Sequence, residues 1–461
     1  MKFTRTETAA FGLGAVGKDM VYALASSYVL YYYQDVLGLS AAFVGLILMI
    51  ARIFDAVNDP FMGIVVAKTN TRFGRFRPWI LSGTVLNALV LYFLFAAPDI
   101  TGAPLMVWFS ATYILWGVTY TMMDIPYWSM IPAVTSNPRE RENLSVVGRG
   151  CAGIGNALVT VFALMAVSAL GGGDERTGFG RLALVVAVLF VVAEVVLFVT
   201  IREKRSETET KSGTIREMIR ALTQNDQAMV TVLTIILVNS AMYITLNLII
   251  YFFKYDFGGE NWIQSYTTFN MVGGLGQILG MTALYPLLHR KLPNQTVFRM
   301  ALAVSIAGYL AIMVLCLTGL GHSLIAICIP GLLVFSMSGV LIVLTTVFLS
   351  GTVDYGEIRT GRREESVIFS MQTFVVKAAS GLSVFIAGLG ISLIGLQGNT
   401  DQTAVVAEVQ SASTIMGLRC LMTLLPAAGL VAATIVFIRY FRLTDERMNE
   451  IANRLKERRE S

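Results

Sequence analysis

The sequence predicts an all-α membrane protein with twelve transmembrane helices arranged as two six-helix repeats. Hydrophobic residues make up 55% of the 461 residues and the mean hydropathy is +0.67. Only 14% of the residues are charged, whereas soluble domains contain about 25%. The apolar residues form blocks of about 20 or more, the length that a helix needs to cross a hydrocarbon core of ~30 Å. Because lipid does not tolerate unpaired backbone groups, these blocks are expected to be helical, and a soluble fold is excluded.

Twelve apolar segments are expected to span the membrane. Several exceed the ~20 residues of a straight crossing, so tilt or extension beyond the bilayer is expected. The predicted spans are 8–34, 41–67, 78–97, 105–132, 145–170, 180–201, 228–256, 264–288, 298–319, 323–350, 366–396 and 412–440.

The charges of the loops predict the topology. Basic residues gather in alternate loops and in the C-terminal tail, whereas the opposite loops are short and mostly acidic. The positive-inside rule therefore predicts that both termini are cytoplasmic, which an even number of spans also requires. Residues 202–227 are expected to be a cytoplasmic connector between six-helix bundles at 1–201 and 228–440, with a cytoplasmic tail at 441–461. Charged loops are expected at 137–143 and 354–365, and this weak symmetry fits two parallel repeats around a central cavity.

Enzymatic and redox functions have no support in the sequence. The four cysteines stand singly in apolar segments, without metal or redox spacing. His289 and His322 are both at predicted helix ends, and no nucleophile–base set accompanies them. No segment suggests nucleic-acid binding. Lys18 and Asp19 interrupt the first apolar segment, so a removable signal peptide is not expected.

Charged residues within segment 52–60 indicate a cation site. A charge at the membrane centre costs at least ~2.5–3.5 kcal/mol, so it usually faces a cavity or a partner. Asp55, Asn58 and Asp59 share one helical face, with Arg52 nearby. This oxygen set suits Na⁺ or Li⁺. Alternatively, either carboxylate could bind a proton, because apposed like charges disfavour each other's ionised form. An ion-pair lattice that only fastens helices together is the structural alternative.

A stripe of aromatic and acidic residues indicates a sugar site. Tyr120, Asp124 and Trp128 recur every four residues on one helical face. An aromatic ring can stack on a pyranose, while a carboxylate accepts hydrogen bonds from two hydroxyl groups. Thr121 lies about one turn before Asp124 and could contribute an oxygen to the cation site. The alternative for the aromatic residues is packing or location at the membrane interface.

Further polar residues lie within predicted spans. Lys18 or Arg149 could donate to sugar hydroxyls or keep Asp19 and the acid of the stripe ionised. Thr373 and Lys377 form an i, i+4 pair in the second half of the chain. Lys377 requires an acidic partner, and the candidates in the first half are Asp55, Asp59 and Asp124. Two charged residues without an assigned role are interpreted as helix-packing or lipid-boundary positions: Glu194 and Arg419.

The loop at 70–79 places a glycine among basic residues. Arg75 and Arg77 could form a cytoplasmic gate with carboxylates at neighbouring helix ends, although a topology signal alone would also explain them. A matching gate in the second half would contain Asp354, Glu357 and Arg363.

Short motifs along almost the whole chain resemble the melibiose permeases. These belong to the glycoside–pentoside–hexuronide:cation symporters, within the major facilitator fold. The motifs follow the family's order and are Gly17-Lys18-Asp19, Tyr31-Tyr32-Tyr33 before Asp35, Ala51-Arg52, Asp55-Ala56, Asn58-Asp59-Pro60, Arg72 through Ile80, Tyr113 through Gly117, Asp124-Ile125-Pro126, Asp354 through Glu357 and the helix with Lys377.

The resemblance implies roles for residues of this chain. It implies a cation site whose retained amide and threonine look Na⁺-capable, formed by Asp55, Asn58, Asp59 and Thr121. It implies that a sugar is held by Asp19, Asp124, Trp128 and Arg149, with Lys18, Tyr120 and Thr373 alongside. Lys377 would link the two sites. Ser26 and Ser27 depart from the pattern, because the family has a bulkier aromatic residue there, so the size of the preferred sugar is left open.

Residues and resemblance together predict symport of a galactoside-type sugar such as melibiose with Na⁺, Li⁺ or H⁺. The expected location is the cytoplasmic membrane of a bacterium, and the expected partners are the sugar, the cation and membrane lipid. No cofactor is expected, and a monomer suffices. The alternatives are a pentoside, a glucuronide or a lysophospholipid as solute, or a sugar sensor that does not transport.

Overall fold

The computed structural model describes residues 4–135, 138–203, 225–360, 365–397 and 410–460. In these ranges the chain is helical and forms no strand, apart from an isolated bridge between Thr71 and Gly74. Its contacts divide it into two compact units. Unit 1 consists of Met1–Thr210 and Leu396–Glu408, and unit 2 of Lys211–Gly395 and Val409–Ser461.

Unit 1 contains six long helices and two short ones. Each long helix begins and ends within a few residues of a predicted span, except that α6 begins earlier. The first helix starts with a capping box, in which Thr4 accepts a bond from the backbone N–H of Glu7 and the Glu7 carboxylate accepts one in return. The helices are α1 (Arg5–Tyr31), η1 (Tyr32–Val36), α2 (Ala41–Lys68), α3 (Arg77–Phe95), α4 (Ala103–Ser129), α5 (Ile131–Val134), α6 (Pro138–Gly171) and α7 (Glu175–Thr200).

Unit 2 also contains six long helices, with short additions. Two of the long helices, α9 and α10, continue into π-helical segments. The helices are α9 (Asp226–Tyr251), η2 (Phe252–Phe257), α10 (Trp262–Leu279), η3 (Gly280–Leu284), α11 (Tyr285–His289), α12 (Asn294–Leu317), η4 (Leu320–His322), α13 (Leu324–Thr360), α14 (Glu365–Leu393), α15 (Ala412–Tyr440) and α16 (Asp445–Glu460).

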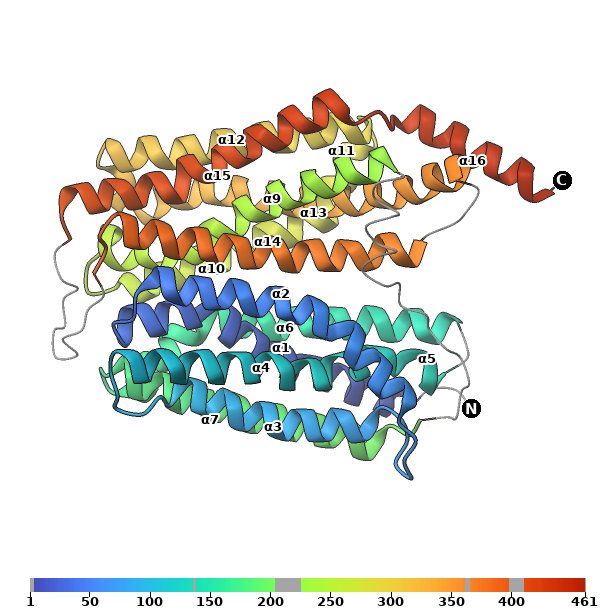
Figure 1. Cartoon of the computed structure of the whole chain (residues 1–461). Helices are drawn as coiled ribbons and strands as arrows, with labels where there is room; N and C mark the ends of the chain where they lie inside the picture. Colours follow the sequence, from blue (N-terminus) through green and yellow to red (C-terminus); the bar gives the residue numbers. More distant parts are fainter. Residues whose placement is uncertain (1–3, 136–137, 204–224, 361–364, 398–409, 461) are drawn as a thin grey trace. The chain divides into compact units, whose positions relative to one another are not determined.

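The same helix pairs recur in both units (Figure 1). Counting the long helices of each unit from one to six, the first packs on the fifth and sixth, the third on the fourth and sixth, and the second on the fourth. In unit 1 these pairs are α1–α6, α1–α7, α3–α4, α3–α7 and α2–α4. In unit 2 they are α9–α14, α9–α15, α12–α13, α12–α15 and α10–α13. Both units therefore follow one packing plan.

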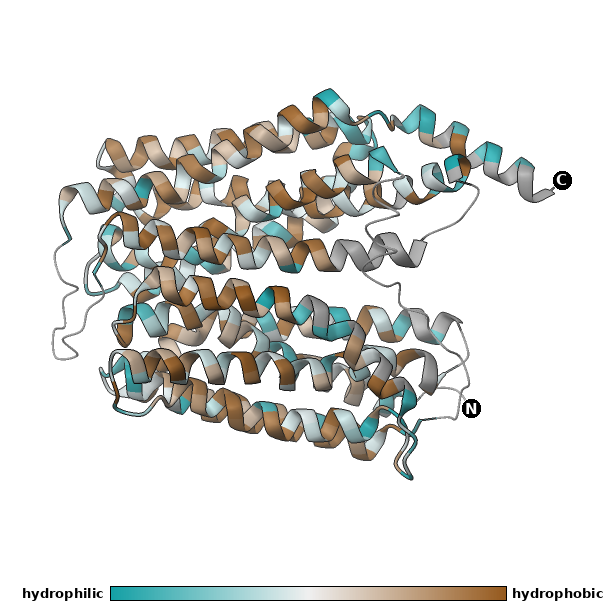
Figure 2. Ribbon diagram, viewed as in Figure 1, coloured by the Kyte–Doolittle hydropathy of each residue, from teal (hydrophilic) through white to brown (hydrophobic). Residues whose placement is uncertain are grey.

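The helices carry the apolar surface of a membrane protein. Figure 2 shows hydrophobic residues along the helices and hydrophilic ones mainly at their ends and in the loops. Large apolar side chains face outward, such as Ile325 and Leu393, which are each 77% exposed. Within the described residues, nine helices are long and apolar enough to cross a membrane. The nine do not include α1, α2 and α4, so the predicted number of twelve spans is not confirmed.

Two predicted charged loops are wrong. Residues 138–143 form the beginning of α6, and residues 354–360 form the end of α13. Hydropathy marks where the bilayer ends, but a helix can continue into water when its backbone bonds remain satisfied. The predicted tail is likewise helical in α16, which packs on α13 through Met448 and Gly351.

Small residues allow the helices of unit 1 to approach closely. A Cβ on Gly17 of α1 would lie 3.1 Å from the backbone of Phe190 in α7, and one on Gly83 of α3 would lie 2.9 Å from the backbone of Met123 in α4. Such contacts are typical of membrane helices, whose association depends on close packing. They join α1 to α7 and α3 to α4.

Candidate functional site

Lys18 is the centre of a polar cluster inside unit 1. Its side chain, on α1, is only 3% exposed, and its Nζ lies 2.7 Å from Asp124 Oδ1 and 2.9 Å from Asp19 Oδ2. The ammonium also lies 3.5 Å from the hydroxyl of Tyr120. Two carboxylates therefore share one ammonium.

Aromatic rings surround this ammonium. Its nitrogen lies 5.0 Å from the ring centre of Trp128 and 5.4 Å from that of Tyr127, within the range of cation–π attraction. Trp128 also donates from its Nε1 to Asp124 Oδ1 over 3.1 Å. On the other side of the cluster, the guanidinium of Arg149 lies 5.3 Å from the Trp128 ring. The helical stripe of α4 is thus joined to α1 and α6.

The carboxylates keep part of their surface open. The side chains of Asp19 and Asp124 are 19% and 24% exposed, whereas Lys18 is buried beneath them. Accessible carboxylate oxygens beside an indole ring and a guanidinium offer acceptors, a stacking face and donors. This is the set of groups that binds a neutral, hydroxyl-rich molecule. Six of the seven residues predicted for the sugar site lie together here.

A second polar cluster joins α2 to α4. Thr121 donates from its hydroxyl to Asp59 Oδ1 over 3.2 Å, and Arg52 Nη1 lies 3.7 Å from Asp55 Oδ2. Asp55 is 7% exposed, while Asn58 and Asp59 are half-buried. Carboxylate, amide and hydroxyl oxygens on facing helices match the ligands that hard cations prefer.

Gly117 on α4 makes room for one of these carboxylates. A Cβ on Gly117 would lie 2.8 Å from Asp55 Oδ1, closer than van der Waals contact permits. The glycine of the Tyr113–Gly117 motif therefore fixes how closely Asp55 approaches α4. Sequence analysis assigned it no role in the cation site.

Tyr22 connects the two clusters. The guanidinium of Arg52 lies 5.2 Å from the Tyr22 ring centre, and this ring lies 5.5 Å from that of Tyr120. Trp116 stacks on Tyr120 at 5.4 Å and lies 6.3 Å from Tyr22. A continuous path of contacts therefore runs from the Asp55 ion pair to the Lys18 cluster. No pattern in the sequence identified Tyr22, because a single tyrosine in an apolar helix has no distinctive spacing.

Several predicted residues belong to unit 2 or lie outside the described residues. Lys377 is half-buried on α14 of unit 2. Thr373 lies on the same helix, but its side chain is outside the described part of the chain. Asp354 and Glu357 are on α13, and Arg363 is outside the described residues. The proposed association of these residues with unit 1 remains a prediction.

The loop with Arg75 and Arg77 is held by an acid that sequence analysis did not single out. Glu203 accepts bonds from the backbone N–H groups of Arg75, Phe76 and Arg77 at 2.7–2.9 Å. The Arg77 guanidinium donates to the carbonyl oxygen of Phe198 and lies 4.3 Å from that residue's ring. Glu203 therefore caps the N-terminus of α3, where a carboxylate is favoured by the helix dipole.

The two unassigned charges have different environments. Glu194 is 0% exposed on α7, so the lipid-boundary interpretation is wrong for it. Arg419 on α15 binds Asp256 of η2 through two bonds, Nε–Oδ2 at 2.7 Å and Nη2–Oδ1 at 2.6 Å. Its role is thus an ion pair within unit 2, which spacing could not reveal because Asp256 lies 163 residues away along the chain.

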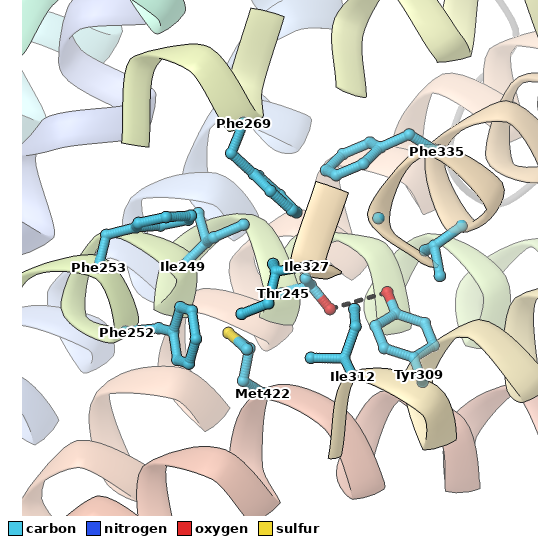
Figure 3. A pocket seen from close by; sticks show the side chains of 12 residues that line it. Thr245, Ile249, Phe252, Phe253, Phe269, Tyr309, Ile312, Ile327, Phe335 and Met422 are labelled. Carbon is cyan, nitrogen blue, oxygen red and sulfur yellow. Dashed lines mark hydrogen bonds between the residues drawn. The ribbon is translucent and has the colours of Figure 1, made fainter. Parts of the chain in front are cut away.

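Unit 2 contains an apolar cavity that is too small for a sugar (Figure 3). Phenylalanine and aliphatic side chains line it, and Thr245 Oγ1 lies 2.8 Å from the Tyr309 hydroxyl at its wall. Its volume is about 10 Å³, the lower limit for one water molecule. This cavity is therefore not a candidate for solute binding.

Comparisons with known proteins give consistent results. Residues 10–445 match the family described as "MFS/sugar transport protein". The isoprimeverose transporter of Lactiplantibacillus pentosus is 29% identical over 409 residues, 87% of this chain and 82% of the relative. The inner membrane symporter YicJ of Escherichia coli K12 is 28% identical, covering 97% of this chain and 94% of the relative. The raffinose carrier protein of Pediococcus pentosaceus is 27% identical, and the match covers 97% of this chain and 70% of the relative.

Proposed function

The chain belongs to the MFS/sugar transport family, and from this premise we propose that it carries out cation-coupled symport of a galactoside-type sugar by alternating access. It is a transporter and not an enzyme, and a multi-pass protein of the bacterial inner membrane. The observation that carries the proposal is the buried Lys18, which is shared by two partly open carboxylates beside Trp128.

The proposed sugar site is the Lys18 cluster. Asp19 and Asp124 accept bonds from sugar hydroxyls, and Arg149 donates to sugar oxygens. Trp128 offers its indole face to the pyranose, while Lys18 and Tyr120 support the carboxylates from beneath. Thr373 is proposed as a further sugar-binding residue, as the family resemblance implies. Hydrogen bonds to charged groups contribute about 1.5–3 kcal/mol each, so a few of them suffice for micromolar to millimolar affinity.

The proposed cation site is formed by Asp55, Asn58, Asp59 and Thr121, with Na⁺ as the favoured ion and Li⁺ or H⁺ as alternatives. The bond between Thr121 and Asp59 supports it, because this bond brings oxygens of two helices together. The cation neutralises two acids that otherwise repel each other and attract Lys377. Its arrival is expected to stabilise the sugar-binding arrangement. Because coupling free energy is reciprocal, sugar must tighten cation binding by the same factor.

We propose a cytoplasmic gate in unit 1 that contains Arg75 and Arg77, and a matching gate in unit 2 that contains Asp354, Glu357 and Arg363. Alternating access requires that such contacts break and form as the site changes sides. The cap that Glu203 places on α3 supports a gate whose position is fixed by a helix end.

One relative favours a second candidate solute. The isoprimeverose transporter is named for a disaccharide that contains a pentose, so a pentoside carried by the same mechanism is the main rival. The raffinose carrier is named for a galactoside and favours the first candidate. A glucuronide and a lysophospholipid have less support, because the partly open carboxylates of the site suit neutral hydroxyl groups. A sensor without transport has less support because the family is one of sugar transporters.

Uptake into proteoliposomes tests the proposal. Labelled melibiose is expected to accumulate when an inward Na⁺ gradient is imposed, and Asp59→Cys is expected to abolish accumulation. Asp99→Cys is the matched control, because Asp99 is 93% exposed and lies outside both clusters. Isoprimeverose and raffinose are measured in parallel. If only isoprimeverose were taken up, the solute would be assigned as a pentoside instead of a galactoside. If accumulation did not depend on Na⁺, Li⁺ or pH, symport would be refuted.

A further inference from the structure

Glu194 is a buried acid without a hydrogen-bond donor. It lies in α7 at 0% exposure, and among the described residues neither carboxyl oxygen has a hydrogen-bond partner. An ionised carboxylate in such a place loses its hydration without compensation. A neutral carboxylic acid loses far less, so this environment favours the protonated form.

Gly14 and Tyr127 define where this carboxyl group lies. A Cβ on Gly14 would lie 3.2 Å from Glu194 Oε1 and 3.2 Å from Cε2 of Tyr127. The acid therefore occupies the space left by a glycine of α1, next to the edge of an aromatic ring of α4. The Tyr127 hydroxyl offers it no bond, because it donates to the carbonyl oxygen of Phe11 over 2.5 Å.

The acid faces the cluster around Lys18. Tyr127 is a neighbour of both groups, because its ring centre lies 5.4 Å from Lys18 Nζ, and its Cε2 and Glu194 Oε1 each lie 3.2 Å from the position of a Cβ on Gly14. Lys18 and Asp124 act electrostatically on Glu194. Lys18 already contacts two carboxylates at 2.9 and 2.7 Å. Ionisation of Glu194 would place a third carboxylate near one ammonium. That charge would compete with Asp124 and Asp19 for the same partner.

Among the described residues, Lys18 is the cation that acts on Glu194. The helices α1, α3 and α6 and the segment η1 pack on α7. On α3 the charged and titratable residues are Arg77 and Tyr92, near its two ends. The titratable and charged groups that face the Glu194–Tyr127 region are Lys18 and Asp19 of α1, Asp124 of α4 and Cys151 of α6.

We propose that Glu194 is a proton-binding site, separate from the cation site of α2 and α4, and that its proton keeps Lys18 available to the sugar-binding carboxylates. Deprotonation breaks only the O–H bond of Glu194, leaves the electron pair on the carboxylate and releases the proton to water. The existence of the proton site is independent of the proposed function, whereas its effect on sugar binding rests on that function. Na⁺ bound near Asp59 and the proton on Glu194 then do not compete for one site.

Infrared difference spectroscopy of the purified protein tests the proton site. The wild type is expected to show the carbonyl band of a protonated carboxylic acid at neutral pH, and this band should disappear at alkaline pH. Glu194→Gln should remove the band, while the matched control Glu7→Gln, at a half-buried capping position of α1, should keep it. If Glu194→Gln does not fold, Glu194→Met must remove the same band. A spectrum unchanged in either variant at position 194 overturns the proposal.

Sugar binding tests the consequence. Melibiose affinity of the wild type should fall at alkaline pH with a limiting slope of about tenfold per pH unit, the linkage value for one proton. Glu194→Gln should retain the affinity at neutral pH and lose this slope. An unchanged slope in Glu194→Gln refutes the link to Lys18. A wild type that binds no sugar but shows the band refutes the proposed function and leaves the proton site in place.

Discussion

Replacing Asp124 with asparagine removes one charge from the proposed sugar site at nearly constant volume. In the structure this carboxylate accepts bonds from Lys18 at 2.7 Å and from Trp128 at 3.1 Å. Lys18 keeps its contact with Asp19 at 2.9 Å, and the side chain at position 124 is 24% exposed. The variant should therefore fold, and its effect should be confined to the site.

The expected loss of affinity follows from the strength of the bonds to sugar. A hydrogen bond to a charged group contributes about 1.5–3 kcal/mol, and a neutral one about 0.5–1.5 kcal/mol. If Asp124 accepts two hydroxyl groups, Asp124→Asn loses about 2–3 kcal/mol, which weakens Kd by about 30- to 150-fold. Isothermal titration of the purified protein with melibiose measures this change.

Two controls separate binding from folding in this experiment. Asp99→Asn alters an acid that pairs with Arg176 at 2.8 Å and is 93% exposed, so its sugar affinity should equal that of the wild type. Thermal unfolding should show similar transitions for the wild type and both variants. The reasoning is refuted if Asp124→Asn binds sugar within about twofold of the wild type, because a group in direct contact must contribute more than that.

Three further substitutions test particular contacts. Gly117→Ala should displace Asp55, because the Oδ1 of Asp55 would lie 2.8 Å from the new Cβ. This variant should lose the stimulation of sugar uptake by Na⁺. The control Gly150→Ala, whose Cβ meets open space, should show the same stimulation as the wild type. In titrations, Tyr22→Leu should reduce the factor by which Na⁺ tightens sugar binding, and Tyr22→Phe should show the same factor as the wild type. If the wild type and both variants gave equal factors, the contacts of the Tyr22 ring with Arg52 and Tyr120 would not couple the two sites. Glu203→Gln should lower the free energy of unfolding by about 1–3 kcal/mol, because three backbone donors lose a charged acceptor; an unchanged Tm would exclude this cap.

Much of the fold could be predicted from the sequence because the bilayer imposes one rule on every segment. The span predicted at 412–440 coincides with α15. The span predicted at 41–67 begins at the same residue as α2 and ends one residue before that helix ends. The errors occur where the rule no longer applies. Beyond the lipid, polar residues do not prevent a helix from continuing, and so α13 reaches Thr360 and α6 begins at Pro138.

The candidate site was partly predictable for a similar reason. Helix geometry alone places Tyr120, Asp124 and Trp128 on one face, and it does the same for Asp55 and Asp59. These groupings need no knowledge of other helices. Glu203 could not be identified in this way, because its partners are backbone N–H groups more than 120 residues away.

By itself the sequence determined the class of protein, the helices and the polar faces within single helices, because these depend on local composition and on the fixed pitch of the helix. Only the tertiary structure decided which faces meet. It joined Lys18 to Asp124 on a different helix, in addition to its sequence neighbour Asp19, and it placed Tyr22 between two clusters. Among the described residues, it left Glu194 buried without a hydrogen-bond donor. The physical reason is that contacts between helices depend on close packing at positions such as Gly14 and Gly83, whose neighbours lie far away along the chain.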